Sequence, residues 1–483
     1  MFSKVLVANR GEIALRVIRA CRDLGVLSVA VHSTADAGAA FVRLADEAVE
    51  IGPADAAQSY LSAERIIEAS RKTGAEAIHP GYGFLSENAD FAAACAEAGL
   101  VFVGPPPEAI AAMGDKVAAR RLMSEAGVPV VPGSGPVDDV EAAVTAARTV
   151  GYPLFLKASA GGGGVGMRLI GDESELRREF EALQGVAGRI FKDRTLFVER
   201  YLARARHIEV QLLADSRGGA VHLGERECSV QRRRQKLIEE SPSPALDPAS
   251  EERMGKTALE AARSVGYRGA GTVEFVYADG EFFFIEMNTR LQVEHPVTEM
   301  VTGLDLVVEQ LRIAAGEPLS VGQDEIVRSG HAVECRVYAE DYLESFRPSP
   351  GRVTAYREPA GPGVRVDSAL RGPGPVPAEY DPMVAKVITW GRDREQACAR
   401  MRRALSEYVI SGVRNNIPYH LAVLSEAEFL AGDYSTAYVE EHPDLVEEAS
   451  RWEERRQGFL GAVLDPARVA AIAAALSMHA PSS

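Results

Sequence analysis

Apolar and polar residues along the first hundred positions predict strands separated by helices. The runs KVLVA, LSVAVHS, AVEIG, EAIHPGYG and LVFVG have the apolar character of strands in a buried sheet. Apolar residues at helical spacing fill EIALRVIRACRDLG, where we expect Asn9 to cap the helix, with Glu12 three residues on, and Gly25 to end it. Strands and helices in alternation predict a small parallel α/β layer.

The pattern changes twice further along the chain. PPPEAI after Gly104 marks a boundary, and DKVAARRLMSEAG then predicts a helix ahead of a strand-rich stretch that ends near Val301. From about His331, short strands alternate with proline and glycine turns, as in RPSPGRVTAY, and helices are expected near 394–405 and 419–430. A chain of 483 residues has room for roughly two to four domains.

Four consecutive glycines stand in KASAGGGGVGMR, residues 157–168. Gly161, Gly163 and Gly166 match the dinucleotide-binding pattern G-x-G-x-x-G, but that pattern needs a strand before it and a helix after it. The flanks YPLFLKAS and GMRLIG both have the pattern of strands, so we expect the tip of a β-hairpin whose backbone N–H groups can face an anion. The alternative is a flexible surface hairpin that binds nothing.

The segment GTVEFVYADGEFFFIEMNTRLQVEHP carries the most informative polar pattern. Alternate residues of an extended chain share a face. One face would therefore collect Glu286, Asn288, Arg290, Gln292 and Glu294. The alternative is a solvated strand face, but such faces are rich in Lys, Thr and Ser, whereas this one mixes carboxylates, carboxamides and an arginine.

Glu274, upstream of the turn ADG, joins this face only under one loop length. A three-residue loop would place it on the face of Glu286, whereas a two-residue loop would place it on the opposite face. With the longer loop, Glu274, Glu286 and Asn288 form a group of hard oxygen ligands suited to Mg²⁺ beside nucleotide phosphates.

Basic residues gather in ERECSVQRRRQK, which holds Arg232, Arg233, Arg234 and Lys236. Basic runs are usually solvated, but the neighbouring metal strand and glycine loop favour a site for small anions. The strand RHIEVQLL places His207 on a polar face with Glu209 and Gln211, although a single histidine is more often structural. Lys157 precedes the glycines, where an ammonium can reach a phosphate.

Composition and charge exclude several classes of function. The net charge of −16 argues against nucleic acid or an anionic membrane as a general partner. Five scattered cysteines without a C-x-x-C pair form neither a disulfide framework nor a zinc site. Neither a signal peptide nor a membrane span stands out, so the expectation is a cytoplasmic protein.

With these residues in hand, the chain resembles the biotin carboxylases, the ATP-grasp subunits or domains of acetyl-CoA, propionyl-CoA and pyruvate carboxylases. The resemblance runs through VLVANRGEIALRVIRAC, AIHPGYGFLSEN, MGDK, KASAGGGG, RHIEVQLLAD, FIEMNTRLQVEHPVTE, HAVECRVYAED, PSPG and YDPMVAK, over roughly the first 440 positions. It implies an α/β and α+β multidomain fold: a Rossmann-like domain at 1–114, an ATP-grasp domain at 115–330 with a glycine-rich lid at about 131–203, and a β-rich C-terminal domain at 331–445. A helical tail at 446–483 lies beyond it.

The resemblance also implies an ATP-dependent carbon–nitrogen ligase. ATP would phosphorylate bicarbonate to carboxyphosphate, and the carboxyl group would pass to N1 of biotin. The positions that match nucleotide contacts are Lys116, Lys157, Gly162, Gly163, Gly164, Glu199, Leu202, His207, Gln231 and Arg234. Those that match Mg²⁺ or Mn²⁺ ligands are Glu274, Glu286 and Asn288. Those that match the bicarbonate pocket are Lys236, Arg290, Gln292 and Val293; Glu294 matches the general base, Arg336 the cation that stabilises the biotin enolate, and Tyr82 lies in the motif facing biotin.

Two departures affect the lid. Ala160 stands where the family usually has a glycine, and Val165 where Lys or Arg is common, which removes a positive charge. Arg234 replaces the usual His, Asn or aromatic residue and adds one. Neither lid change touches the metal or base positions.

Partners follow from what the sequence does not contain. No lysine follows Lys386, so the C-terminal part cannot carry biotin, which we expect on a separate biotin carrier protein. A carboxyltransferase would then choose the final acceptor, and a homodimer is a family expectation. The alternatives are the corresponding subunit of a pyruvate or other biotin-dependent carboxylase, a carbamoyl-phosphate-type ATP-grasp ligase, and a catalytically impaired scaffold subunit.

Overall fold

The computed structural model describes residues 1–159, 166–190 and 193–463. Its N-terminal part is a five-stranded parallel sheet in the order β3-β2-β1-β4-β5. Parallel strands need long crossover connections, which the helices provide. The strands are β1 (Lys4–Val7), β2 (Leu27–Ser33), β3 (Glu47–Gly52), β4 (Ala77–His79) and β5 (Val101–Phe102), and the helices are α1 (Gly11–Asp23), α2 (Ala40–Leu44), α3 (Ala63–Thr73) and α4 (Ala89–Glu97). The predicted α/β layer is confirmed.

The strand order reverses between β1 and β4, which are neighbours. In open parallel sheets, ligand-binding crevices form outside the carboxyl ends of strands at such a point. Here the loop with Asn9 follows β1 and the loop with Tyr82 follows β4. The helix after β1 is not capped as expected, because Arg10 is the N-cap residue and the Asn9 amide instead donates to the carbonyl oxygens of Pro80 (2.7 Å) and Tyr82 (2.8 Å).

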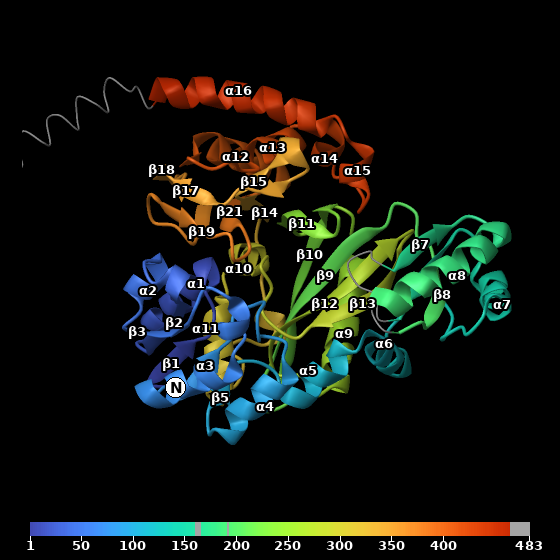
Figure 1. Cartoon of the computed structure of the whole chain (residues 1–483), viewed down its shortest axis with the longest axis horizontal. Coiled ribbons are helices and arrows are strands. Elements are labelled where there is room, and N and C mark those ends of the chain that lie inside the picture. The colour runs from blue at the N-terminus through green and yellow to red at the C-terminus, as the bar shows by residue number, and fades with distance from the viewer. Residues whose placement is uncertain (160–165, 191–192, 464–483) are drawn as a thin grey trace, which may run out of the picture.

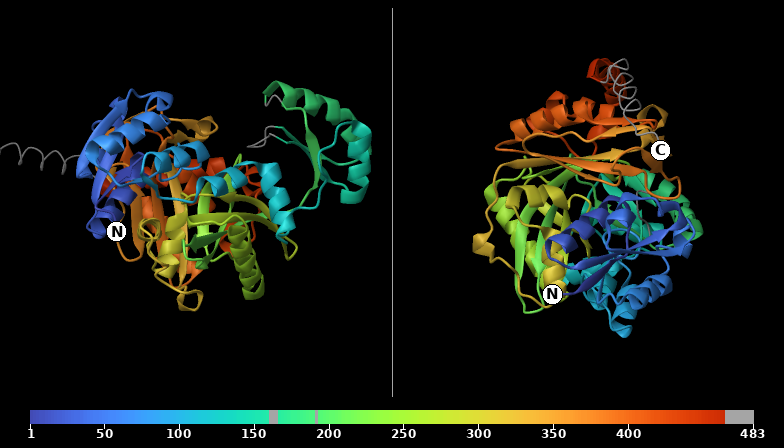
Figure 2. Two further views of the ribbon diagram at one scale, coloured as in Figure 1. Left: turned by 90° about the horizontal axis from the view of Figure 1, so that it is seen from below. Right: turned by 90° about the vertical axis from the view of Figure 1, so that its left-hand side faces the viewer.

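Helices α5 (Pro107–Gly114) and α6 (Lys116–Glu125) lead from this layer to a small separate unit. That unit has a three-stranded antiparallel sheet in the order β7-β6-β8, and Figure 2 shows it standing to one side of the body. Its elements are α7 (Val140–Val150), β6 (Leu154–Ala158), β7 (Met167–Ile170), α8 (Glu173–Ile190) and β8 (Leu196–Arg200). Because β6 and β7 pair antiparallel across the glycine run, the predicted hairpin is confirmed and the dinucleotide-binding turn is excluded.

An eight-stranded sheet forms the centre of the molecule, in the order β13-β12-β9-β10-β11-β14-β21-β19 (Figure 1). Its antiparallel pairing of β11 with β14 carries one sheet across position 330, so the predicted units at 115–330 and 331–445 share it. The strands are β9 (Arg206–Ala214), β10 (Ala220–Arg232), β11 (Gln235–Ser241), β12 (Gly269–Ala278), β13 (Glu281–Asn288), β14 (His331–Tyr338), β19 (Val364–Ser368) and β21 (Met383–Gly391). Helices α9 (Pro248–Ser264), α10 (His295–Thr302) and α11 (Leu306–Ala314) belong to the same region. The strand-rich stretch thus ends at Asn288, before the expected Val301.

The C-terminal part adds short strand pairs and helices above this sheet (Figure 1). The pairs are β15 (Glu340–Asp341) with β16 (Arg347–Pro348), β17 (Gly351–Val353) with β20 (Gly374–Val376), and β18 (Ala355–Arg357) with β22 (Val409–Ser411). The helices are α12 (Arg394–Glu407), α13 (Ile417–Val423), α14 (Ala427–Ala431), α15 (Tyr438–Glu441) and α16 (Leu445–Val463). The helix predicted near 419–430 is therefore two short helices. Among the described residues, every helix is too short or too polar to cross a bilayer.

Candidate active site

A cavity of about 980 Å³ lies between the three-stranded unit and the eight-stranded sheet. Most of the predicted site residues line it, although they come from segments far apart in sequence. The predicted residues along its wall are Lys116, Lys157, Glu199, Leu202, His207, Gln231, Arg234, Lys236, Glu274, Glu286, Asn288, Arg290, Gln292, Val293, Glu294 and Arg336. Tyr82 is not in this wall. Gly162, Gly163 and Gly164, like Ala160 and Val165, lie outside the described residues.

The hairpin β12–β13 brings Glu274 and Glu286 together by a route that the loop length alone does not give. The loop has two residues, Asp279 and Gly280, both at positive φ (51° and 80°). With regular pairing this would place Glu274 opposite Ile285. A register shift next to Glu274 instead pairs it with Glu286, so the two carboxylates share a face. The predicted oxygen cluster therefore forms through a β-bulge.

The extended polar face does not continue to Glu294 as predicted. Strand β13 ends at Asn288, and the chain turns so that Glu294 becomes the N-cap residue of α10. Arg290 is held by Glu87 (Nε to Oε2, 2.9 Å) and by Asn288 (Nη2 to Oδ1, 3.0 Å). The side chains still converge on the cavity, but through a turn rather than through strand alternation.

Glu274 is the most heavily contacted carboxylate of the metal-type cluster. It accepts from Lys236 (3.0 Å), Asn288 (2.9 Å) and Gln292 (2.7 Å), and its other oxygen lies 3.0 Å from His207 Nε2. Burial alone would raise the pKa of Glu274, but the charges of Lys236 and His207 outweigh it and hold that pKa well below its usual range. Glu274 is therefore an anion at neutral pH.

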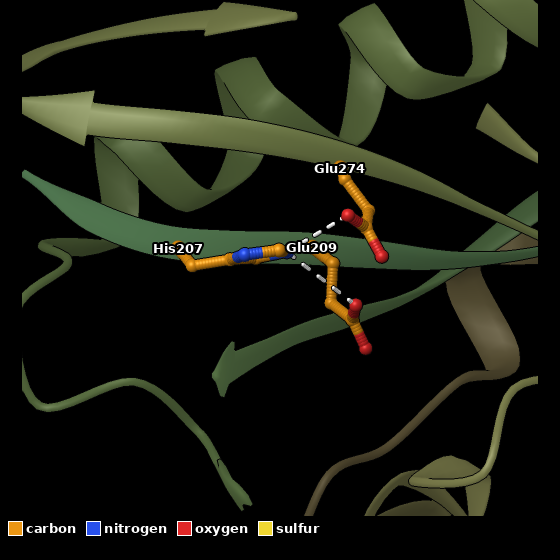
Figure 3. A group of neighbouring side chains, drawn as sticks. All are labelled: His207, Glu209 and Glu274. Carbon is orange, nitrogen blue, oxygen red and sulfur yellow. Dashed lines mark ion pairs between the residues drawn. The ribbon is translucent and has the colours of Figure 1, made fainter. Parts of the chain in front are cut away.

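Glu274 belongs to two sets of residues that could contribute metal ligands. His207, Glu209 and Glu274 bring ligand atoms within 4.8 Å of one another, and Figure 3 shows the imidazole pointing toward both carboxylates. The predicted set of Glu274, Glu286 and Asn288 offers oxygen atoms throughout, which is the preference of Mg²⁺. Lys116 Nζ lies 2.7 Å from Glu286, so both predicted carboxylates already attract cations. The residues fit an oxygen-bound Mg²⁺.

Glu294 has the environment of a base that stays ionised. Its two oxygens accept from Lys236 (2.5 Å) and Arg336 (3.0 Å), and its side chain is buried. Burial would raise the pKa of Glu294, but Lys236, Arg336 and Arg226 hold it well below its usual range. Glu239, the other carboxylate on Arg336 (2.5 Å), differs, because burial raises its pKa to about 7. Two carboxylates on one arginine thus have opposite pKa shifts, a pattern found in acid–base sites.

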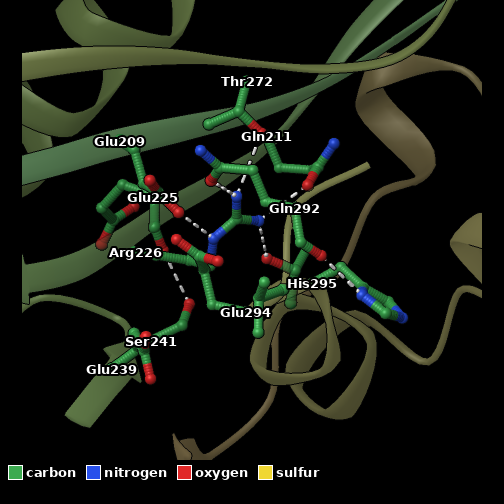
Figure 4. A network of polar contacts seen from close by, with 12 residues as sticks. Glu209, Gln211, Glu225, Arg226, Glu239, Ser241, Thr272, Gln292, Glu294 and His295 are labelled. Carbon is green, nitrogen blue, oxygen red and sulfur yellow. Dashed lines mark hydrogen bonds and ion pairs between the residues drawn. The ribbon is translucent and has the colours of Figure 1, made fainter. Parts of the chain in front are cut away.

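Arg226 is a site residue that the sequence analysis missed. Its guanidinium is fully buried at the centre of the network in Figure 4. It donates to Glu209 (2.5 Å), Gln211 (2.7 Å), Gln292 (2.9 Å), Thr272 (3.0 Å) and Thr298 (3.0 Å). The available signal was a run of charged residues, Glu225, Arg226 and Glu227, inside the predicted strand-rich stretch, but charged residues are more often exposed.

One side of the cavity is lined by cations. Lys157 and the unpredicted Arg120 both contact the Glu199 carboxylate. Arg233 and Arg234 form the β10–β11 turn at positive φ (47° and 68°), a strained backbone for non-glycine residues, and both line the cavity. Arg233, Arg234 and Lys236 of the predicted basic cluster thus line the cavity.

Arg232 is the exception in that cluster. Its guanidinium lies 4.4 Å from the ring centroid of Phe346 and donates to the Ser345 carbonyl, away from the cavity.

Comparison with known proteins relates the chain to one family. Three family models match: biotin carboxylase N-terminal domain over 1–110, carbamoyl-phosphate synthase L chain ATP-binding domain over 115–321, and biotin carboxylase C-terminal domain over 334–441. The chain is 53% identical over 442 residues to a biotin carboxylase from Nostoc sp., covering 91% of this chain and 99% of the relative. It is 51% identical over 488 residues to a pyruvate carboxylase subunit from Methanothermobacter thermautotrophicus, covering 99% of each.

A solved structure agrees with these relatives. The biotin carboxylase domain of 2-oxoglutarate carboxylase from Hydrogenobacter thermophilus, crystallised as a dimer with MgADP, ADP and bicarbonate, superposes with a TM-score of 0.86. Its sequence is 48% identical, and the match covers 92% of this chain and 99% of that one. Fold, cavity and sequence agree, and the chain belongs to the biotin carboxylase family.

Proposed function

We propose that this chain uses ATP and bicarbonate to carboxylate biotin carried by a separate biotin carrier protein. ATP-dependent carboxylation of biotin is the activity of the family. The observation that carries the proposal is the Glu294 carboxylate, ionised between Lys236 and Arg336 at the cavity wall. An ionised carboxylate at this position can accept the proton of bicarbonate as the bicarbonate oxygen attacks the γ-phosphorus of ATP and the bond to ADP breaks.

The neighbouring residues would position the substrates. Arg290, Gln292, Val293 and Lys236 would hold bicarbonate, because they line the wall beside Glu294. Lys236 donates its three N–H groups to Glu209, Glu274 and Glu294, so its ammonium is fixed in place. Arg336 would stabilise negative charge on the biotin ureido oxygen as its N1 attacks the carboxyl carbon.

The nucleotide would occupy the cationic side of the same cavity. Its proposed contacts are Lys116, Lys157, Glu199, Leu202, His207, Gln231 and Arg234. Mg²⁺, or Mn²⁺ as the alternative, would be held by Glu274, Glu286 and Asn288 and would neutralise phosphate charge there. The MgADP and bicarbonate named for the Hydrogenobacter thermophilus structure support this assignment.

The final acceptor would be chosen by a carboxyltransferase partner. Our first proposal is an acyl-CoA, as in acetyl-CoA carboxylase and fatty acid biosynthesis. The 51% identity to a pyruvate carboxylase subunit supports a 2-oxo acid as the second candidate. Carboxybiotin-dependent carboxylation of acetyl-CoA and of pyruvate by the reconstituted enzyme would separate the two. A cytoplasmic homodimer with the predicted division into domains completes the proposal.

The test is phosphate release from Mg·ATP and bicarbonate, with and without free biotin. We expect turnover that needs bicarbonate and rises with biotin, and that falls by about 10²- to 10⁴-fold in Glu294→Gln. Glu64→Gln, an exposed change on α3, is the control and should leave turnover unaltered. ATP binding without turnover in the parent enzyme would contradict the proposal and support the scaffold alternative.

A further inference from the structure

Lys386 is a fully buried ammonium that the proposed chemistry does not yet use. It lies on β21, opposite Arg336 on β14 and opposite Asp367 on β19, and its exposed fraction is 0%. A buried cation is costly unless it is paired and hydrogen-bonded. The contacts of Lys386 therefore indicate the role of its charge.

One partner of Lys386 is the turn that carries the proposed base. Lys386 Nζ donates to the Val293 carbonyl oxygen at 2.8 Å. Its strand neighbour Arg336 donates to the side chain of the next residue, Glu294, at 3.0 Å. Two adjacent cations on the sheet thus hold consecutive residues of one turn, by backbone and by side chain. Because a peptide unit is planar, fixing the Val293 carbonyl also fixes the N–H of Glu294.

The other partner of Lys386 leads to Tyr82. Lys386 Nζ lies 3.2 Å from Glu12 Oε1 and 5.8 Å from the centroid of the Tyr82 ring. The Tyr82 hydroxyl in turn donates to the same oxygen of Glu12. Tyr82 lies in the loop after β4, and the Asn9 amide in the loop after the neighbouring strand β1 donates to its carbonyl oxygen. The Lys386 ammonium therefore connects the turn at Val293 and Glu294 with the loop expected to face biotin.

We propose that Lys386 is a positioning residue for biotin carboxylation, an inference that rests on the proposed function. Lys386 holds the Val293 carbonyl on one side and the Glu12–Tyr82 pair on the other. The proposed bicarbonate pocket and the biotin-facing loop belong to different sheets, and the Arg290–Glu87 pair joins them at the exposed side. Lys386 joins them at the buried side, so that the two substrates meet at a fixed distance.

The test is Lys386→Met, which keeps the length of the side chain and removes its charge and donors. We expect the KM for bicarbonate and the KM for biotin each to rise about 10-fold or more, with the KM for ATP nearly unchanged. A merely structural role would lower the fraction of active enzyme, and hence kcat, without moving either KM. That result would overturn the proposal.

A matched control removes a cation from a buried carboxylate elsewhere. Arg328 pairs with the buried Glu225 at 2.8 Å and does not line the cavity. Arg328→Met should lower the unfolding temperature without changing either KM. If Lys386→Met does not fold, Glu12→Gln is tested in its place. The glutamine oxygen still accepts from Tyr82 but lacks the negative charge that attracts the ammonium. Both KM values should rise again, and unchanged values would refute the link.

A second readout does not depend on turnover. Thermal unfolding of Lys386→Met, Tyr82→Phe and the double variant should be non-additive, because both residues act on Glu12. Additive shifts would overturn the connection even in an inactive enzyme. Absence of turnover in the parent enzyme would instead contradict the proposed function, so the two failures are distinguishable.

Discussion

Replacing Arg226 with methionine tests the buried network beside the proposed bicarbonate pocket. The guanidinium has no exposed surface, and methionine fills a similar volume without its donors. The change removes the donors to Glu209, Gln211, Thr272, Gln292 and Thr298. The first of these acceptors is a carboxylate that is itself fully buried.

The magnitude follows from that carboxylate. Removing one partner of a buried ion pair costs about 3–5 kcal/mol, because the remaining charge is left in a medium of low polarity. Glu209 keeps Lys236 at 2.6 Å, so we expect the lower end, a loss of about 3 kcal/mol in the free energy of unfolding. Gln292 also loses the donor to its carbonyl, so the KM for bicarbonate should rise.

The assay is urea unfolding followed by circular dichroism, with the parent, Arg226→Met, Glu209→Gln and the double variant measured together. The double variant should be more stable than the sum of the single losses predicts, because no unpaired carboxylate remains. An unchanged unfolding midpoint for Arg226→Met, or strictly additive losses, would refute the reasoning.

Three further predictions concern protonation, metal and substrate. Burial lowers the pKa of His79 to about 4. When the pH falls below the ordinary histidine pKa, the unfolded chain therefore binds a proton that the folded chain does not. The free energy of unfolding should fall by about 2 kcal/mol between pH 7 and pH 5, and by less in His79→Asn. Equal pH dependence of the two unfolding midpoints would contradict this. Glu286→Gln should raise the Mg²⁺ concentration for half-maximal turnover about 10-fold or more, because it removes a charged oxygen beside Lys116; an unchanged Mg²⁺ titration would exclude that role. Arg290→Lys loses the hydrogen bond to Glu87 and should raise the KM for bicarbonate, not for ATP, by about 10-fold, and equal changes in both would count against a bicarbonate pocket.

Local patterns were sufficient for the elements and for most of the site. The five parallel strands, the glycine hairpin and helix α6 follow from periodicities of two and 3.6 residues, which depend only on near neighbours. The polar residues from Glu286 to Glu294 were identified as a site by their composition, and all five line the cavity. Their place in a site could be predicted because carboxylates, amides and an arginine rarely gather on a solvated face.

The reasons why these residues meet are not local. Glu274 faces Glu286 because of a bulge whose position depends on packing, since the two-residue loop alone would separate them. Asn9 and Glu12 resembled a helix cap, yet they hold the Tyr82 loop, because the strand order places β4 beside β1.

Arg226 and Lys386 were beyond the reach of sequence reasoning for the same reason. A cation is buried only where several acceptors converge on it, and these acceptors come from strands and helices distant in sequence. The sequence by itself therefore determined most of the elements and most of the side chains that line the cavity. Only the tertiary structure decided which charges face one another, because register and strand order are set by long-range packing.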